Sequence, residues 1–91
     1  MLFTHDKTKE ITSQLNQFLK EGKLVVVNSY LFWIDFATAD GQLECRREII
    51  APGKRYEMRF YNVFRNGVKI DFRFSPSDVY RLFHYHLTKS N

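Results

Sequence analysis

The sequence predicts an α+β domain: a four-stranded antiparallel meander sheet, flanked by an N-terminal and a C-terminal helix. The prediction depends on three turn dipeptides between segments rich in β-branched and aromatic residues: Asp40-Gly41, Pro52-Gly53 and Asn66-Gly67. Asp-Gly and Asn-Gly favour type I′ hairpin turns, because these turns need positive φ at both central positions. Pro-Gly suits a type II turn, in which proline presets φ and glycine takes the positive value. Three such turns join four consecutive strands in the order α-β-β-β-β-α.

The segment 6–21 is predicted to form the first helix. It carries one apolar stripe with the spacing i, i+4, i+7 and i+8, formed by Ile11, Leu15, Phe18 and Leu19. Asp6 is the expected N-cap, with Thr4 as the alternative, because a side-chain oxygen there can accept a free backbone N–H. Gly22 stands where a C′ glycine closes a helix.

The segment from Ser75 to about residue 87 is predicted to form the second helix. Ser75 is the expected N-cap, Pro76 fits the first helical position, and Asp78 completes a capping box. Its apolar stripe comprises Val79, Leu82, Phe83 and either His86 or Leu87. The remaining strand-forming segments are 24–37, 42–50, 54–65 and 68–74, with Asn28-Ser29 marking a bulge or bend in the first of them.

The turns also predict which residues share a face of the sheet. Two-residue turns place Phe36 opposite Cys45 and Cys45 opposite Phe60. The expected core face holds Tyr30, Phe32, Ile34, Phe36, Cys45, Ile49, Tyr56, Met58, Phe60 and Phe64. The expected solvent face holds Trp33, Asp35, Glu44, Arg46, Glu48, Arg55, Glu57 and Arg59.

The fourth predicted strand conflicts with this assignment. The Asn66-Gly67 turn places Ile70 and Phe72 on the solvent face, and it directs Arg73 toward the core. A bulge in the third strand, near 59–61, removes the conflict and brings Arg73 to the solvent face. The alternative is a sheet with one helix on each face.

Composition predicts a single domain over 1–91 with one modest core. Apolar residues make up 44% of the 91 residues, and aromatic residues make up 16%. Cys45 is the single cysteine, so an internal disulfide cannot form, which suits a reducing cytoplasm. The sequence has neither the apolar run of a membrane span nor a recognisable signal peptide, and the expected location is therefore cytoplasmic.

The charge distribution favours nucleic acid as a partner. The formal net charge is +4, and most of the basic residues lie within the predicted strands. Aromatic rings stack on bases and arginines neutralise phosphates, so an aromatic and basic sheet face suits single-stranded DNA or RNA. The expected binding residues are Trp33, Arg46, Arg55, Arg59 and Arg73. The plainer alternative is a solvated face of cross-strand ion pairs, because Glu44, Glu48 and Glu57 alternate with the arginines.

The main rival hypothesis is a protein-binding adaptor or inhibitor, or a homodimer. An apolar edge strand can pair with a strand of a partner, and tyrosines are frequent anchors of interfaces. The expected interaction residues are Tyr30, Tyr80 and Tyr85, with burial in the core as the alternative for the helical ones.

The sequence predicts no enzyme, no cofactor, no metal site and no small-molecule substrate. It contains no glycine-rich phosphate loop and no serine elbow. His84 and His86 are two residues apart and therefore point to different sides of a helix. A metal-independent nuclease based on Arg73, Arg81 and His84 is the enzymatic alternative. We therefore expect a small accessory or regulatory protein.

Overall fold

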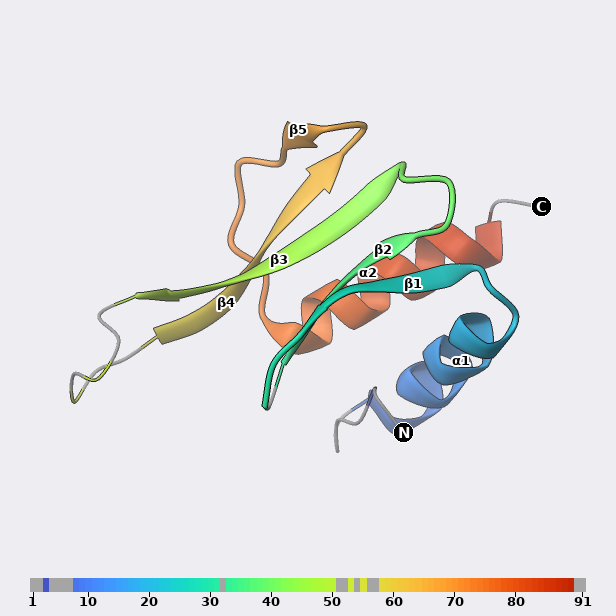
Figure 1. The fold of residues 1–91 in the computed structure, drawn as a ribbon, viewed down its shortest axis with the longest axis horizontal. Helices are drawn as coiled ribbons and strands as arrows, with labels where there is room; N and C mark the ends of the chain where they lie inside the picture. The colour runs from blue at the N-terminus through green and yellow to red at the C-terminus, as the bar shows by residue number, and fades with distance from the viewer. Residues whose placement is uncertain are drawn as a thin grey trace.

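The computed structural model describes residues 3, 8–31, 33–50, 53, 55 and 58–89. It confirms the α+β class: an antiparallel sheet that one helix precedes and another follows in the chain (Figure 1). The elements in chain order are α1 (Lys9–Lys20), β1 (Leu24–Ser29), β2 (Ile34–Thr38), β3 (Leu43–Ile50), β4 (Met58–Arg65), β5 (Val68–Lys69) and α2 (Pro76–Lys89). The sheet has the order β1-β2-β3-β4-β5, so each strand pairs with its neighbour in the sequence.

The sheet has five strands because the segment 24–37, predicted as one strand, is a hairpin. Within it β1 and β2 pair with each other, from Leu24 opposite Thr38 to Ser29 opposite Ile34. The chain reverses between Tyr30 and Trp33, where the Tyr30 N–H donates to the Trp33 carbonyl at 2.8 Å. The register of β1 shifts between residues 26 and 28, close to the predicted irregularity at Asn28-Ser29.

The first and third turn dipeptides set the predicted registers. Phe36 lies opposite Cys45, as a two-residue Asp40-Gly41 turn requires. The Asp40 carboxylate accepts the Gln42 N–H and the Thr38 hydroxyl, and these hydrogen bonds, the amide first, lower its pKa. In the Asn66-Gly67 turn both residues have positive φ, 51° and 82°, the conformation that a type I′ turn demands.

The register predicted from Pro52-Gly53 is wrong. Cys45 pairs with Val63 instead of Phe60, three residues further along, because β3 ends at Ile50 and β4 begins at Met58. Since side chains alternate between faces, an odd shift turns the faces of β4 over. Tyr61 and Val63 therefore face the core, and the predicted conflict with the fourth strand disappears.

The bulge predicted near 59–61 is absent, since β3 and β4 pair without interruption along 58–65. The irregularity lies in the predicted fourth strand, which is not continuous over 68–74. After β5 ends at Lys69, the Ile70 N–H donates to the Val63 carbonyl, and Phe74 forms an isolated bridge with Tyr61.

Both helices pack on one face of the sheet, and the alternative with one helix on each face is wrong. The strand residues of the apolar core cluster all belong to the alternation that contains Phe36, Cys45 and Val63. The core comprises Phe3, Leu15, Leu24, Ile34, Phe36, Leu43, Cys45, Tyr61, Val63, Val79, Tyr80 and Phe83. The two helices also meet each other, where the Gln14 and His84 side chains are hydrogen-bonded. We call this the covered face and the other the open face.

The helix boundaries follow local capping chemistry. Gly22 has φ +77°, and the N–H groups of Gly22 and Lys23 donate to the carbonyls of Leu19 and Phe18, the two bonds of a Schellman motif. The predicted C′ role of Gly22 is thus confirmed. At the start of α1, Thr8 is the N-cap without a side-chain cap bond, and the predicted caps at positions 4 and 6 lie outside the described residues.

The start of α2 agrees with the predicted capping box. The Ser75 hydroxyl accepts the Asp78 N–H at 3.3 Å and donates to the Asp78 carboxylate at 2.8 Å. Pro76 is the first helical residue, where its missing N–H costs nothing. The helix continues to Lys89, two residues beyond the predicted end.

Several predicted side-chain environments are wrong. Asp35 was expected in solvent and is buried, whereas Tyr30 was expected in the core and is exposed. Phe64 follows the inverted alternation of β4 and lies on the open face, opposite Glu44. Other members of the expected faces lie outside the described residues or have side chains outside them: Phe32, Tyr56, Glu57, Met58 and Arg59.

Candidate nucleic-acid interface

The open face presents arginines that lie over phenylalanine rings of β4. The Arg46 guanidinium carbon is 4.8 Å from the centre of the Phe64 ring. Arg46 lies on β3 opposite Asn62, and Phe64 is the next residue of β4 on the same face. The contact is thus a diagonal cross-strand pair, in which the cation faces the negative side of the ring quadrupole.

A second pair of the same kind lies further along β4. The Arg73 guanidinium carbon is 4.7 Å from the centre of the Phe60 ring, and Phe60 is only 5% exposed. Arg73 comes from the irregular segment between β5 and α2, immediately before the bridge residue Phe74. This bridge holds the segment beside β4 and so brings Arg73 to Phe60. The predicted placement of Arg73 with Arg46 on the solvent face therefore agrees with the ring contacts.

Two glutamates accompany these cations. The Arg46 Nε lies 3.0 Å from Glu44 Oε1, and this hydrogen bond raises the pKa of Arg46. Glu48 accepts a hydrogen bond from the Asn62 side-chain amide at 2.7 Å. Within the described part of the chain, Arg73 has no carboxylate partner. Among the described residues, the open face thus combines one arginine that is paired with a carboxylate and one, Arg73, that has no carboxylate partner.

Trp33 does not share this face. Its ring centroid is 4.9 Å from that of Tyr61, and it packs at the edge of the core. Tyr61 lies on the covered face, because it pairs with Arg47 while Arg46 pairs with Asn62. The expected grouping of Trp33 with Arg46 is therefore wrong, since the hairpin turn at 30–33 carries the indole to the other face.

The two other predicted basic residues are Arg55, in the connection between β3 and β4, and Arg59, near the start of β4. Arg55 is exposed and lies in a turn between the two strands. The backbone of Arg59 pairs with Ile49 in the ladder, and its side chain lies outside the described structure. The structure therefore places Arg46 and Arg73 on the same face of the sheet. Trp33 lies on the other face and Arg55 in the connecting turn, whereas the side chain of Arg59 lies outside the described residues.

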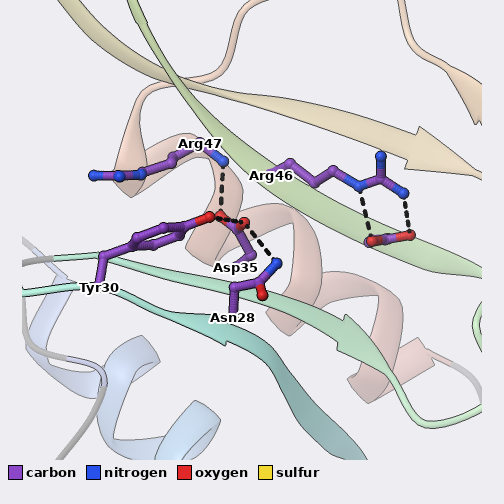
Figure 2. A network of polar contacts seen from close by, with 6 residues as sticks. Asn28, Tyr30, Asp35, Arg46 and Arg47 are labelled. Carbon is purple, nitrogen blue, oxygen red and sulfur yellow. Dashed lines mark hydrogen bonds and ion pairs between the residues drawn. The ribbon is translucent and has the colours of Figure 1, made fainter.

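Asp35 forms a second polar cluster, where β2 separates from β3 (Figure 2). Its Oδ1 accepts the Arg47 backbone N–H at 2.8 Å, and its Oδ2 accepts the Tyr30 hydroxyl at 3.3 Å and the Asn28 amide at 3.5 Å. Backbone pairing between β2 and β3 ends at Phe36 and Cys45. The Asp35 carboxylate therefore accepts the Arg47 N–H in place of a backbone carbonyl of the neighbouring strand. These hydrogen bonds explain how Asp35 is buried at 3% exposure.

On the covered side of the same separation, the Tyr61 hydroxyl donates to the Ile34 carbonyl at 3.0 Å. The Arg47 guanidinium carbon lies 3.6 Å from the centre of the Tyr30 ring, and Figure 2 shows Arg46 and Arg47 pointing apart. Side-chain groups thus hold the tip of the β1–β2 hairpin where backbone hydrogen bonds are missing. This cluster is a structural device, since each oxygen of Asp35 already accepts a hydrogen bond.

The three predicted interaction tyrosines have different environments. Tyr30 is exposed at the hairpin tip and Tyr85 is exposed on α2, with the Lys89 ammonium 4.8 Å from its ring centre. Tyr80 is only 9% exposed and packs against the rings of Phe3 and Phe36. The expectation that Tyr80 is a surface residue is therefore wrong, because the core contact of α2 is broader than its predicted stripe. Burial also raises the pKa of Tyr80.

Sequence reasoning missed the phenylalanines beneath the arginines, and it predicted an apolar edge without naming the residues that form it. Leu31 is 88% exposed at the β1–β2 turn, and Val25 and Val27 are exposed on the edge strand β1. The sequence marked this segment as apolar and close to an edge, but it did not separate the two strands. Phe60 and Phe64 were assigned to the core because the register of β4 was wrong.

The described residues contain no group of three histidine, cysteine or carboxylate side chains placed to hold a metal ion. Cys45 is buried, and burial raises the pKa of its thiol well above the ordinary value. None of the helices in the described ranges has both the length and the apolar character needed to cross a bilayer.

Comparison of the chain with protein-family models, with curated proteins and with solved structures finds no match.

Proposed function

We propose that this protein is a small, non-enzymatic accessory or regulatory protein of the cytoplasm that binds single-stranded nucleic acid on the open face of its sheet. One observation carries the proposal: two guanidinium groups, Arg46 and Arg73, lie over phenylalanine rings of one strand. No helix among the described residues covers this face.

An arginine stacked on a ring can bind a nucleotide in two ways. The outer surface of the guanidinium plane can stack on a base, and its N–H groups can donate to a phosphate. Phe60 and Phe64 are four positions apart on β4, a span of about 13 Å along a strand. One strand of a few nucleotides is long enough to contact both arginines.

The glutamates predict weak, salt-dependent binding. Arg46 must exchange the Glu44 carboxylate for a phosphate, so its pairing opposes part of the gain. Arg73 carries no such cost within the described residues and is expected to contribute more. Since both contacts release counterions, affinity should fall steeply as salt rises.

The test is fluorescence anisotropy of a labelled single-stranded oligonucleotide at two salt concentrations. Arg73→Gln should weaken binding by about fivefold to tenfold and reduce the salt slope by about one. Arg81→Gln is the matched control, because Arg81 is equally charged and lies on α2, 3.9 Å from Asp78. Equal losses in both variants, or no binding at low salt, would contradict the proposal.

A second candidate function is protein binding through the edge strand β1. Its outer edge has no strand partner within the described sheet, and Val25, Val27 and Leu31 are exposed. A strand of another chain could add to such an edge. Light scattering at several concentrations tests self-association, and Val27→Lys should abolish any dimer that forms this way. If the protein is a monomer at all concentrations, the hypothesis that it forms a homodimer through β1 is wrong.

A further inference from the structure

A pocket of about 290 Å³ lies between the end of β4 and the last turns of α2. Arg65, Leu82, Tyr85, His86 and Lys89 line it. The four helical residues have the spacing i, i+3, i+4 and i+7, which places them on one side of α2. Arg65 is the last residue of β4, and the packing of α2 on the covered face brings the two elements together.

Three of the five lining residues are basic, and the other two, Leu82 and Tyr85, supply apolar and aromatic surface, with the Lys89 ammonium 4.8 Å from the centre of the Tyr85 ring. Arg65, His86 and Lys89 supply up to three positive charges, and no acidic residue is among the lining residues. In the described part of the chain, neither Arg65 nor Lys89 forms an ion pair. The carboxyl group of Asp40 lies close enough to His86 to be affected by its charge. Hydrogen bonds from Gln42 and Thr38 are the main causes of the lowered pKa of Asp40, and the charge of His86 adds to them.

The C-terminal end of a helix carries about half a negative charge. Two or three side-chain cations outweigh this contribution, so the pocket is electropositive. An anion that enters it meets the forked N–H groups of Arg65, which match the geometry of phosphate and carboxylate oxygens. The presence of Arg65, His86 and Lys89 in the lining of one pocket suits a group that carries more than one negative charge.

We propose that this pocket binds a phosphate monoester attached to a planar ring, as in a nucleoside 5′-monophosphate. Arg65, His86 and Lys89 hold the phosphate, while Leu82 and Tyr85 contact the ring. The volume is near the lower end of small-molecule pockets, about 300 Å³, which suits a single nucleotide. The site is separate from the open face, because Arg65 follows Phe64 and so belongs to the opposite alternation.

The test is isothermal titration calorimetry with adenosine 5′-monophosphate, inorganic phosphate and adenosine as separate probes. The monophosphate should bind with millimolar or better affinity and more tightly than either part alone. Arg65→Gln should weaken binding of the monophosphate about tenfold. Arg81→Gln also removes one positive charge, but from a part of α2 outside the pocket, and it should change the affinity by no more than about twofold. Tyr85→Ala should lower the affinity for adenosine 5′-monophosphate to that for inorganic phosphate.

Three results would overturn the proposal: no saturable binding of the monophosphate, equal weakening by Arg65→Gln and Arg81→Gln, or adenosine binding as tightly as its monophosphate. Circular dichroism of each variant checks that its helices are retained, so that a loss of binding is not mistaken for unfolding.

The phosphate could belong to a free nucleotide or to the 5′ end of an oligonucleotide. In an Arg73→Gln background, which weakens the open face, a 5′-phosphorylated oligonucleotide is compared with its 5′-hydroxyl form. A preference for the phosphorylated form that Arg65→Gln removes identifies the strand end as the source. Binding of the monophosphate without this preference identifies the free nucleotide. Because the open face is already impaired, failure of this pocket is distinguishable from failure of the sheet interface.

Discussion

The two faces of the sheet keep water from apolar side chains in different ways. On the covered face, Tyr61 and Val63 of β4 pack under two helices with at most 1% exposure. On the open face of the same strand, Phe60 lies against Arg73 and Phe64 against Arg46. The helices that cover one face are fixed by contacts throughout the core. Each guanidinium group that covers a phenylalanine on the other face is positioned by a single flexible side chain. On our proposal, a ligand on the open face displaces this guanidinium cover without unfolding the sheet.

The largest expected effect is that of Phe36→Ala on the covered face. Phe36 is fully buried, with its ring centroid 4.6 Å from that of Phe83 and 4.9 Å from that of Phe3. The substitution should lower the free energy of unfolding by about 3–5 kcal/mol, measured by urea denaturation. Phe64→Ala is the matched control on the open face. A similar loss there would show that the two faces are not covered differently.

A smaller loss of stability is expected for Asp35→Ala, because Asp35 is a buried polar residue on the open face. By alternation Asp35 belongs to the open face, but its carboxylate accepts the Arg47 N–H. Its removal leaves that amide unpaired and should cost about 1–3 kcal/mol, with faster hydrogen exchange at Arg47. Asp35→Asn retains an oxygen acceptor and should cost less. Unchanged exchange at Arg47 in the alanine variant would contradict this role.

Alkaline pH should destabilise the covered face through Cys45. Burial raises the pKa of its thiol in the folded state, whereas the unfolded thiol titrates near pH 8.5. Stability is therefore complete below about pH 8.5 and falls above it by up to about 1.4 kcal/mol per pH unit. Urea denaturation between about pH 8 and pH 10 measures the slope. Cys45→Ala should remove the slope between about pH 8 and pH 9, below the range in which Tyr61 and Tyr80 contribute, because burial also raises the pKa of both phenols. A slope that persists between about pH 8 and pH 9 would assign it to other groups.

The smallest effect on stability is expected for Arg73→Ala on the open face. The substitution uncovers Phe60 and removes one cation–π contact, which should cost about 0.5–1 kcal/mol. Urea denaturation measures the loss, and Arg81→Ala provides an exposed control. A cost above about 2 kcal/mol would mean that Arg73 belongs to the core of the fold and is not available to a ligand.

The fold class was predictable because local chemistry decided most element boundaries. Asp40-Gly41 and Asn66-Gly67 set registers that the structure confirms, and Ser75 and Gly22 mark helix ends as predicted. The Pro52-Gly53 pair was misleading. Gly53 has the expected positive φ of 76°, yet the flanking strands end further away than a two-residue turn allows.

The register of β4 depends on which aromatic residues the helices bury. Its segment Phe60 to Phe64 has aromatic residues on both alternations, so periodicity does not choose between the faces. The choice follows from tertiary packing, in which Tyr61 also satisfies the Ile34 carbonyl. For the candidate interface, the arginines were predictable from charge, but the expected aromatic partner, Trp33, lies against Tyr61.

The contact between α1 and α2 has a consequence for how the chain folds. Each strand pairs with its neighbour in the sequence, so the meander can form from local contacts as the chain is synthesised. Gln14 and His84, in contrast, are joined across 70 positions. Helix α1 is made first and has no helical neighbour until α2 is complete. A nascent chain that has been released only as far as β5 therefore exposes its apolar covered face, and it is then that the protein is most vulnerable to aggregation.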